Sequence, residues 1–162
     1  MDLGRLFPYL LFLHVLGAIV AFGPTFAFPF IGAMGGAERE HGNFAIRVSH
    51  TLAHRLVYPI GITLPITGAA MMFVREINPL NRPFWWLAVA IVLYVIAYGY
   101  SYFVQSKLVG RVIEMTSAPP PPGASGPPPE LLALVARIQR GGMVTTVLLV
   151  TIIFLMVVKP SI

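Results

Sequence analysis

Residues 141–158 read GGMVTTVLLVTIIFLMVV, eighteen consecutive positions without a charged side chain. A helix of about 20 mainly apolar residues crosses the hydrocarbon core of a bilayer, so this stretch predicts a membrane span. Three further stretches have the same character, at residues 6–34, 52–74 and 83–109. The four together make up most of the 162 residues. The sequence therefore predicts an all-α fold, a polytopic membrane four-helix bundle that forms one domain over residues 1–162.

The composition agrees with this interpretation. Hydrophobic residues make up 57% of the chain and charged residues only 10%, against about a quarter charged in soluble domains. A mean hydropathy of +0.80 implies that much of the surface is apolar, which a lipid bilayer tolerates and water does not. The absence of cysteine excludes disulfides, thiolate metal sites and cysteine nucleophiles. The eleven Lys and Arg are scattered singly, which argues against nucleic acid as a partner.

The basic residues also predict an orientation. Seven lie in the first and third loops or the adjoining helix ends, against four on the opposite side. By the positive-inside rule, both termini lie outside the inner (plasma) membrane and those two loops lie in the cytoplasm. The third loop, 117–130, is rich in proline and is expected to form an extended strap, followed by a helical extension over 130–140. Trp85 and Trp86 are expected in an aromatic belt at the outer surface.

Two histidines lie at membrane depth, where an ionisable group is costly unless it has a partner. At 1.5 Å per residue, His14 lies about 9 Å from the bilayer centre toward the outside, and His54 about 13 Å toward the cytoplasm. This separation of about 20 Å along the membrane normal disfavours one iron held by both. His14 has apolar or small neighbours on its own helix, so its partner must lie elsewhere. Haem iron, a proton relay and a neighbouring helix are the three alternatives.

Polar residues of the second, third and fourth spans converge in depth on the cytoplasmic half. His50, His54 and Tyr58 form one stripe at a spacing of four, and the third span carries a second stripe. These residues predict an inner polar pocket, with the candidate binding residues His54, Tyr102, Gln105 and Arg140. The alternative is that they only bond one another between helices. Methionines, namely Met71, Met72 and Met156, are the candidates for a second axial ligand of a haem at His14.

Residues 9–23, YLLFLHVLGAIVAFG, carry a Leu-His-Val motif followed by glycines, and the second span continues through Thr67 and Gly68. This pattern resembles the first helices of a bacterial group that includes the copper-resistance protein D family, the haem-dependent membrane protoporphyrinogen oxidase family and an uncharacterised four-helix integral membrane family. The uncharacterised family is the most similar in length and number of spans. Resemblance to the oxidases implies that His14 ligates b-type haem. Their second ligand is a lysine of a later helix, whereas the lysines here, Lys107 and Lys159, lie at span ends.

The leading hypothesis is thus an integral membrane protein that binds b-type haem and has a redox or electron-transfer role. His14 is the first candidate metal ligand, and His54 is the candidate ligand of a second, inner haem. Two alternatives stay open: a non-catalytic accessory or scaffold subunit of a membrane complex, and a quinone or proton-relay site without metal. The expected partners are the lipid bilayer, a quinone, and other membrane subunits or a second copy of the chain. No catalytic residue is assigned.

Overall fold

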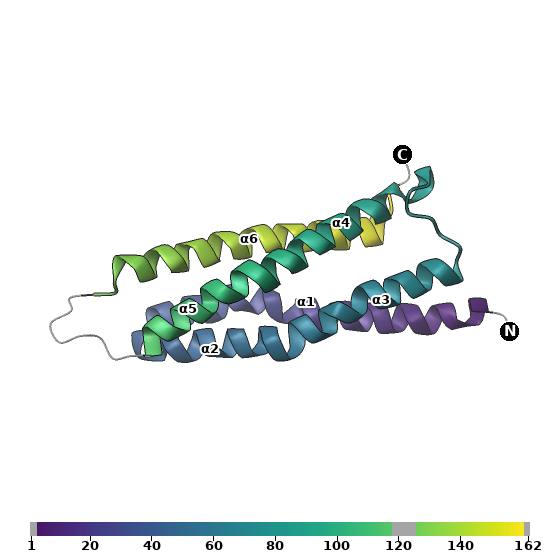
Figure 1. Cartoon of the computed structure of the whole chain (residues 1–162). Helices are drawn as coiled ribbons and strands as arrows, with labels where there is room; N and C mark the ends of the chain where they lie inside the picture. Colours follow the sequence, from purple (N-terminus) through teal and green to yellow (C-terminus); the bar gives the residue numbers. More distant parts are fainter. Residues whose placement is uncertain (1–2, 118–125, 161–162) are drawn as a thin grey trace.

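The computed structural model describes residues 3–117 and 126–160. Within these ranges the chain forms four long helical rods and no strand, which confirms the all-α membrane architecture. The first rod is α1 (Phe7–Ala37), and the second joins α2 (Gly42–Leu52) to α3 (Tyr58–Val74). The third joins α4 (Trp85–Tyr100) to α5 (Ser106–Ser117), and the fourth is α6 (Pro129–Val158). The rods run side by side, alternating in direction, with both termini at one end and the α1–α2 turn at the other (Figure 1).

The rods are longer than the bilayer is thick. They span 34, 33, 36 and 30 residues, or about 45 to 54 Å at 1.5 Å per residue, against about 30 Å of hydrocarbon. The excess lies at the α2 and α5 end, where charged residues are spread along the helices and not gathered at their tips. Hydropathy predicted that the second span begins at residue 52 and that the third span ends at residue 109. The structure extends both rods beyond these limits, through α2 and α5, because these two helices pack against each other. Asn43 Nδ2 donates to Thr116 Oγ1 at 2.8 Å across this pair.

Each of the two middle rods contains one wide helical turn. The π-helical turns are Ala53–Val57, between α2 and α3, and Ser101–Gln105, between α4 and α5. The first precedes Pro59, which lacks an N–H and whose ring would press on the carbonyl four residues back. The second has no proline nearby. The two turns meet across the bundle, because the Tyr58 hydroxyl donates to the Ser101 carbonyl at 2.9 Å.

Side chains pack most tightly in two places. Between α4 and α6 an apolar cluster is buried, formed by Trp86, Leu87, Ala90, Leu149, Ile152 and Leu155. Between α1 and α3, small residues allow close approach, since a Cβ at Gly17 would lie 3.2 Å from Leu64 Cδ2. Trp86 is only 8% exposed and its indole donates to the Pro83 carbonyl. It is therefore part of the apolar cluster between α4 and α6 and not of the expected aromatic belt. Many large apolar side chains elsewhere are exposed and suit a lipid surface.

Candidate functional site

His14 lies on α1 and meets α3. Its Nδ1 is 2.8 Å from Thr67 Oγ1. The Thr67 hydroxyl in turn donates to carbonyl oxygens of its own helix, Thr63 at 3.0 Å and Leu64 at 3.1 Å. With the hydroxyl proton directed at these carbonyls, the oxygen of Thr67 is free to accept, so we assign His14 Nδ1 as the donor; the other ring tautomer would reverse this bond. A neutral imidazole in this arrangement has no proton on Nε2, so that nitrogen keeps its lone pair for a metal or a proton.

One edge of the His14 ring lies against α3. A Cβ added at Gly68 would lie 3.5 Å from His14 Cε1, so the imidazole edge rests against a position without a side chain. One turn further along α1, Gly17 packs on Leu64. Gly17, the first small residue after His14 on α1, therefore serves close packing of α1 against α3.

The two histidines proposed as metal ligands are far apart. His14 is level with Thr67, and Thr67 lies thirteen residues beyond His54 on the same rod. At 1.5 Å per residue this is about 20 Å, which agrees with the separation predicted from the span positions. A single iron held by both is therefore inconsistent with the structure.

Two of the candidate methionines have a packing role. Met72 and Met156 both pack against the apolar cluster between α4 and α6. A methionine thioether fills irregular space in such a core, so packing alone accounts for both side chains without metal binding. The structure therefore gives these two no distinct role at His14.

The inner histidine stripe forms a stack of rings. The His50 and His54 ring centroids are 4.3 Å apart, and the Tyr58 ring meets His54 edge-on at 5.1 Å. His54 Nε2 is 2.7 Å from Ser106 Oγ on α5. His54 thus has a hydrogen-bond partner on the third rod, although the residue is exposed at the surface of the bundle. Ser106 was not among the predicted residues, because a serine at a helix surface carries no signal of its own.

The tyrosines of the third rod hold it to the second. Tyr94, Tyr98 and Tyr102 stack in a row with centroids 5.8 and 6.3 Å apart. The Tyr94 hydroxyl donates to the Gly61 carbonyl at 2.6 Å, and the Tyr98 hydroxyl to the Tyr58 carbonyl at 2.9 Å. These contacts are interhelical hydrogen bonds of the kind that membrane bundles use for assembly.

Proline explains why one of these bonds exists. Pro65 has no N–H, so the carbonyl four residues earlier, that of Gly61, has no donor within its own helix. The Tyr94 hydroxyl supplies that donor. Gly61 also makes room for the ring row, since a Cβ there would lie 2.8 Å from Tyr98 Cε2.

Of the other three residues of the predicted inner pocket, Tyr102 lies beside the histidine stripe, since its ring meets the Tyr58 ring edge-on at 5.2 Å and Tyr58 in turn meets His54. Gln105 faces α6, where its Nε2 donates to the Ile138 carbonyl at 3.0 Å while its Oε1 is buried without a partner. Arg140 is exposed, and Tyr102 is 44% exposed. These residues share a level in the bundle but are distributed around its surface and its α5–α6 contact.

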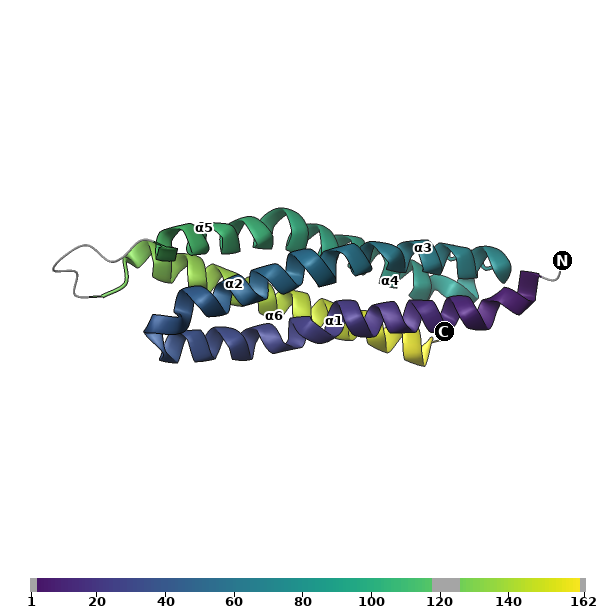
Figure 2. The same cartoon turned by 90° about the horizontal axis from the view of Figure 1, so that it is seen from below.

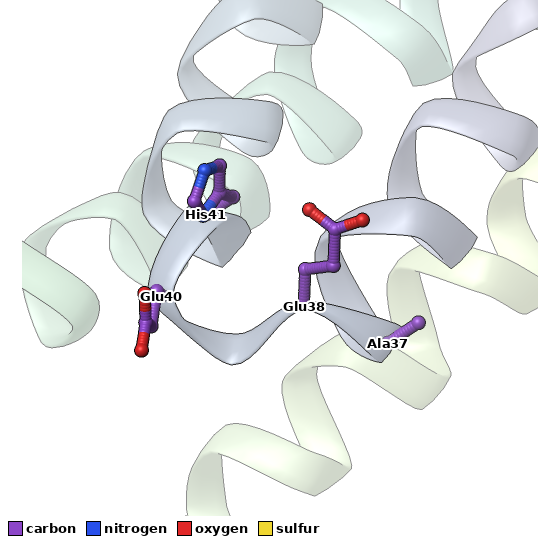
Figure 3. A pocket seen from close by; sticks show the side chains of 4 residues that line it. All are labelled: Ala37, Glu38, Glu40 and His41. Carbon is purple, nitrogen blue, oxygen red and sulfur yellow. The ribbon is translucent and has the colours of Figure 1, made fainter.

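A metal cluster is not apparent in the described ranges, 3–117 and 126–160, where no three His, Asp or Glu side chains are placed to hold an ion. A shallow hollow lies at the α1–α2 turn, lined by Ala37, Glu38, Glu40 and His41 (Figure 3). The carboxylates of Glu38 and Glu40 lie apart there and do not point toward one another. The hollow therefore offers no convergent set of ligands.

A family model described as predicted integral membrane protein (DUF2269) matches residues 8–160. The chain belongs to the DUF2269 family. The match covers all four rods, so the whole DUF2269 bundle, and not one helix of it, is the family's unit. Searches of the curated proteins and of the solved structures found no significant match. Nothing in these comparisons connects the DUF2269 chain with the copper-resistance protein D or protoporphyrinogen oxidase families, so the haem role of His14 stays a prediction.

Proposed function

We propose that this integral membrane protein binds a b-type haem through His14 Nε2 and takes part in electron transfer within the membrane. The observation that carries the proposal is the hydrogen bond between His14 Nδ1 and Thr67 Oγ1. Histidines that bind a metal commonly donate their other ring N–H to an acceptor of this kind, which fixes the tautomer and the ring orientation.

The donor set fits haem better than other metals. A lone imidazole suffices for haem, whose porphyrin supplies four of the iron's ligands, whereas copper or zinc would need further side chains. The described ranges offer no such group around His14. The chain would thus contribute one nitrogen ligand from α1, that of His14. A bound haem would supply one-electron exchange at a depth that water does not reach.

The surrounding residues would orient the ligand. Thr67 is itself held by two carbonyls of α3, so its oxygen cannot easily turn away from the imidazole. The packing of Gly17 on Leu64 keeps α1 and α3 in register at this level. Both features limit rotation of the His14 ring and so hold Nε2 in a constant direction.

Haem content tests the proposal. The chain is expressed with haem supply, purified in mild detergent and assayed for haem per chain by pyridine haemochrome. We expect about one haem per chain and a Soret band, as for a single His-ligated b-type site. A purified, helical protein without a Soret band would overturn the proposal and leave the accessory or scaffold subunit as the function to be tested next.

A quinone site at the inner end is the second candidate. The observation in its favour is the exposure of two polar aromatic side chains, His54 and Tyr102, at the surface of the bundle. Both can form hydrogen bonds with a quinone carbonyl. Quinol binding to the purified protein that is lost in His54→Ala would support this candidate, and unchanged binding in that variant would exclude it.

A further inference from the structure

Four cations lie at one level of the bundle, near the wide helical turns. Two cross-helix contacts fix this level, His54 to Ser106 and Gln105 to Ile138, and Gln105 and Ser106 are adjacent in the chain. Each cation lies within two residues of one of these contacts, so all four fall within about one helical turn of one another along the axis. They come from three of the four rods and form what we call the basic belt: Arg55, Lys107, Arg137 and Arg140.

The belt marks one boundary of the hydrocarbon layer. On the second rod, Arg55 lies twenty residues before Arg75, and on α6 Arg140 lies nineteen residues before Lys159. Both intervals correspond to about 30 Å, the thickness of the bilayer core. The helices α2 and α5 continue past the level of the belt (Figure 2), so by these intervals this end of the bundle extends beyond the hydrocarbon layer.

The belt cations have no acidic partner among the described residues. All four are exposed. The nearest acids on their own rods, Glu114 and Glu130, lie seven residues from the closest belt cation, and Glu130 is already paired with Arg111 at 2.6 Å. Two cations at the opposite end do have partners, since Arg75 lies over the Phe7 ring and Lys159 over the Trp86 ring.

We propose that the basic belt is a binding surface for the phosphates of anionic phospholipids. At the edge of the hydrocarbon, the groups that contact an outward-facing guanidinium or ammonium are lipid headgroups. Arg binds phosphate through paired N–H donors, and an unpaired cation pays no cost of breaking an internal ion pair. The surface extends over three of the four rods and is not a pocket, so it selects lipids by charge. The proposal does not depend on haem binding at His14.

Spin-labelled lipids measure this selectivity directly. The purified full chain is reconstituted into phosphatidylcholine vesicles, and the association of spin-labelled phosphatidylglycerol is compared with that of spin-labelled phosphatidylcholine. We expect the anionic lipid to be preferred by about fivefold, the effect of one Lys or Arg near a charged surface. Because the attraction is electrostatic, 1 M NaCl should abolish the preference in the unmodified protein.

Matched charge variants locate the effect. One variant replaces the belt (Arg55→Gln, Lys107→Gln, Arg137→Gln, Arg140→Gln), and the control replaces the four cations of the other end (Arg5→Gln, Arg75→Gln, Arg82→Gln, Lys159→Gln). We expect the belt variant to lose the preference and the control to retain it. Equal association of both lipids with the unmodified protein, or a preference that survives in the belt variant, would overturn the proposal. Should the belt variant fail to insert into vesicles, the proposal is tested on the unmodified protein alone, whose preference for phosphatidylglycerol must disappear in 1 M NaCl.

Discussion

Replacement of Gly61 by alanine tests how the second and third rods are joined. A Cβ at this position would lie 2.8 Å from Tyr98 Cε2 and 3.3 Å from the Tyr94 hydroxyl. The first distance is shorter than carbon atoms tolerate, so the Tyr98 ring or the helix must move. Because Tyr94 and Tyr98 are stacked, displacement of one ring affects the other. We expect Gly61→Ala to loosen the contact between α3 and α4.

The magnitude follows from two contributions. Overpacking of a filled interior costs about 1–3 kcal/mol. The hydrogen bond from Tyr94 to the Gly61 carbonyl is worth about 0.6–2 kcal/mol in a membrane bundle, and it is weakened when the ring shifts. We therefore expect Gly61→Ala to lower the free energy of unfolding by about 2–4 kcal/mol.

Gly99→Ala is the matched control, because a Cβ at Gly99 would meet no atom within 4 Å. It should leave stability unchanged or raise it by up to about 1 kcal/mol through helix propensity. Unfolding is followed by circular dichroism as SDS replaces mild detergent. Tyr98→Leu removes the ring atom that the new Cβ would meet, so the cost of Gly61→Ala should largely disappear in that background. Equal stability of the Gly61→Ala and Gly99→Ala variants would show that a Cβ at position 61 does not displace the Tyr98 ring.

Three further predictions concern one interhelical hydrogen bond, the partner of His14 and the orientation in the membrane. Tyr94→Phe should destabilise the bundle by about 1–2 kcal/mol in the same assay, because the Gly61 carbonyl would lose its hydroxyl donor; a change below the error of the assay would contradict this. Thr67→Val should weaken haem binding about 10–100-fold in a haem titration while Thr67→Ser should not, since only valine removes the acceptor of the His14 N–H; equal affinities would argue against a positioning role. A reporter active only outside the cytoplasm should be active when fused after Ile162, and activity of a cytoplasmic reporter there would reverse the orientation.

The spans could be predicted from sequence because hydropathy over about 20 residues is a strong signal. Residues 141–158 indicated a membrane helix without any further information, and the structure has α6 across them. The ends of the helices were harder to predict. Backbone hydrogen bonding continues as long as neighbouring helices pack, so α2 and α5 extend the rods into amphipathic segments that a hydropathy criterion ends early.

The partners of the polar residues could be predicted only in kind. Counting residues at 1.5 Å each predicted that His14 and His54 lie about 20 Å apart along the membrane normal. The structure agrees with this separation because the rise per residue of a helix is nearly constant. The identity of each partner depends on the rotation of one helix against another, which no spacing in the sequence encodes. Thr67 and Ser106 are therefore ordinary residues in the sequence and become informative only beside His14 and His54.

Whether His14 binds iron decides the proposed function. The decisive measurement is the reduced-minus-oxidised absorbance spectrum of the purified protein and of His14→Ala, each expressed with haem supply and checked for helix content by circular dichroism. We predict a b-type spectrum for the unmodified protein, and its loss or a marked shift in the variant with helix content unchanged, because the side chain removed is a ligand and not a support of the fold. A haem spectrum that is the same in His14→Ala as in the unmodified protein would contradict the account.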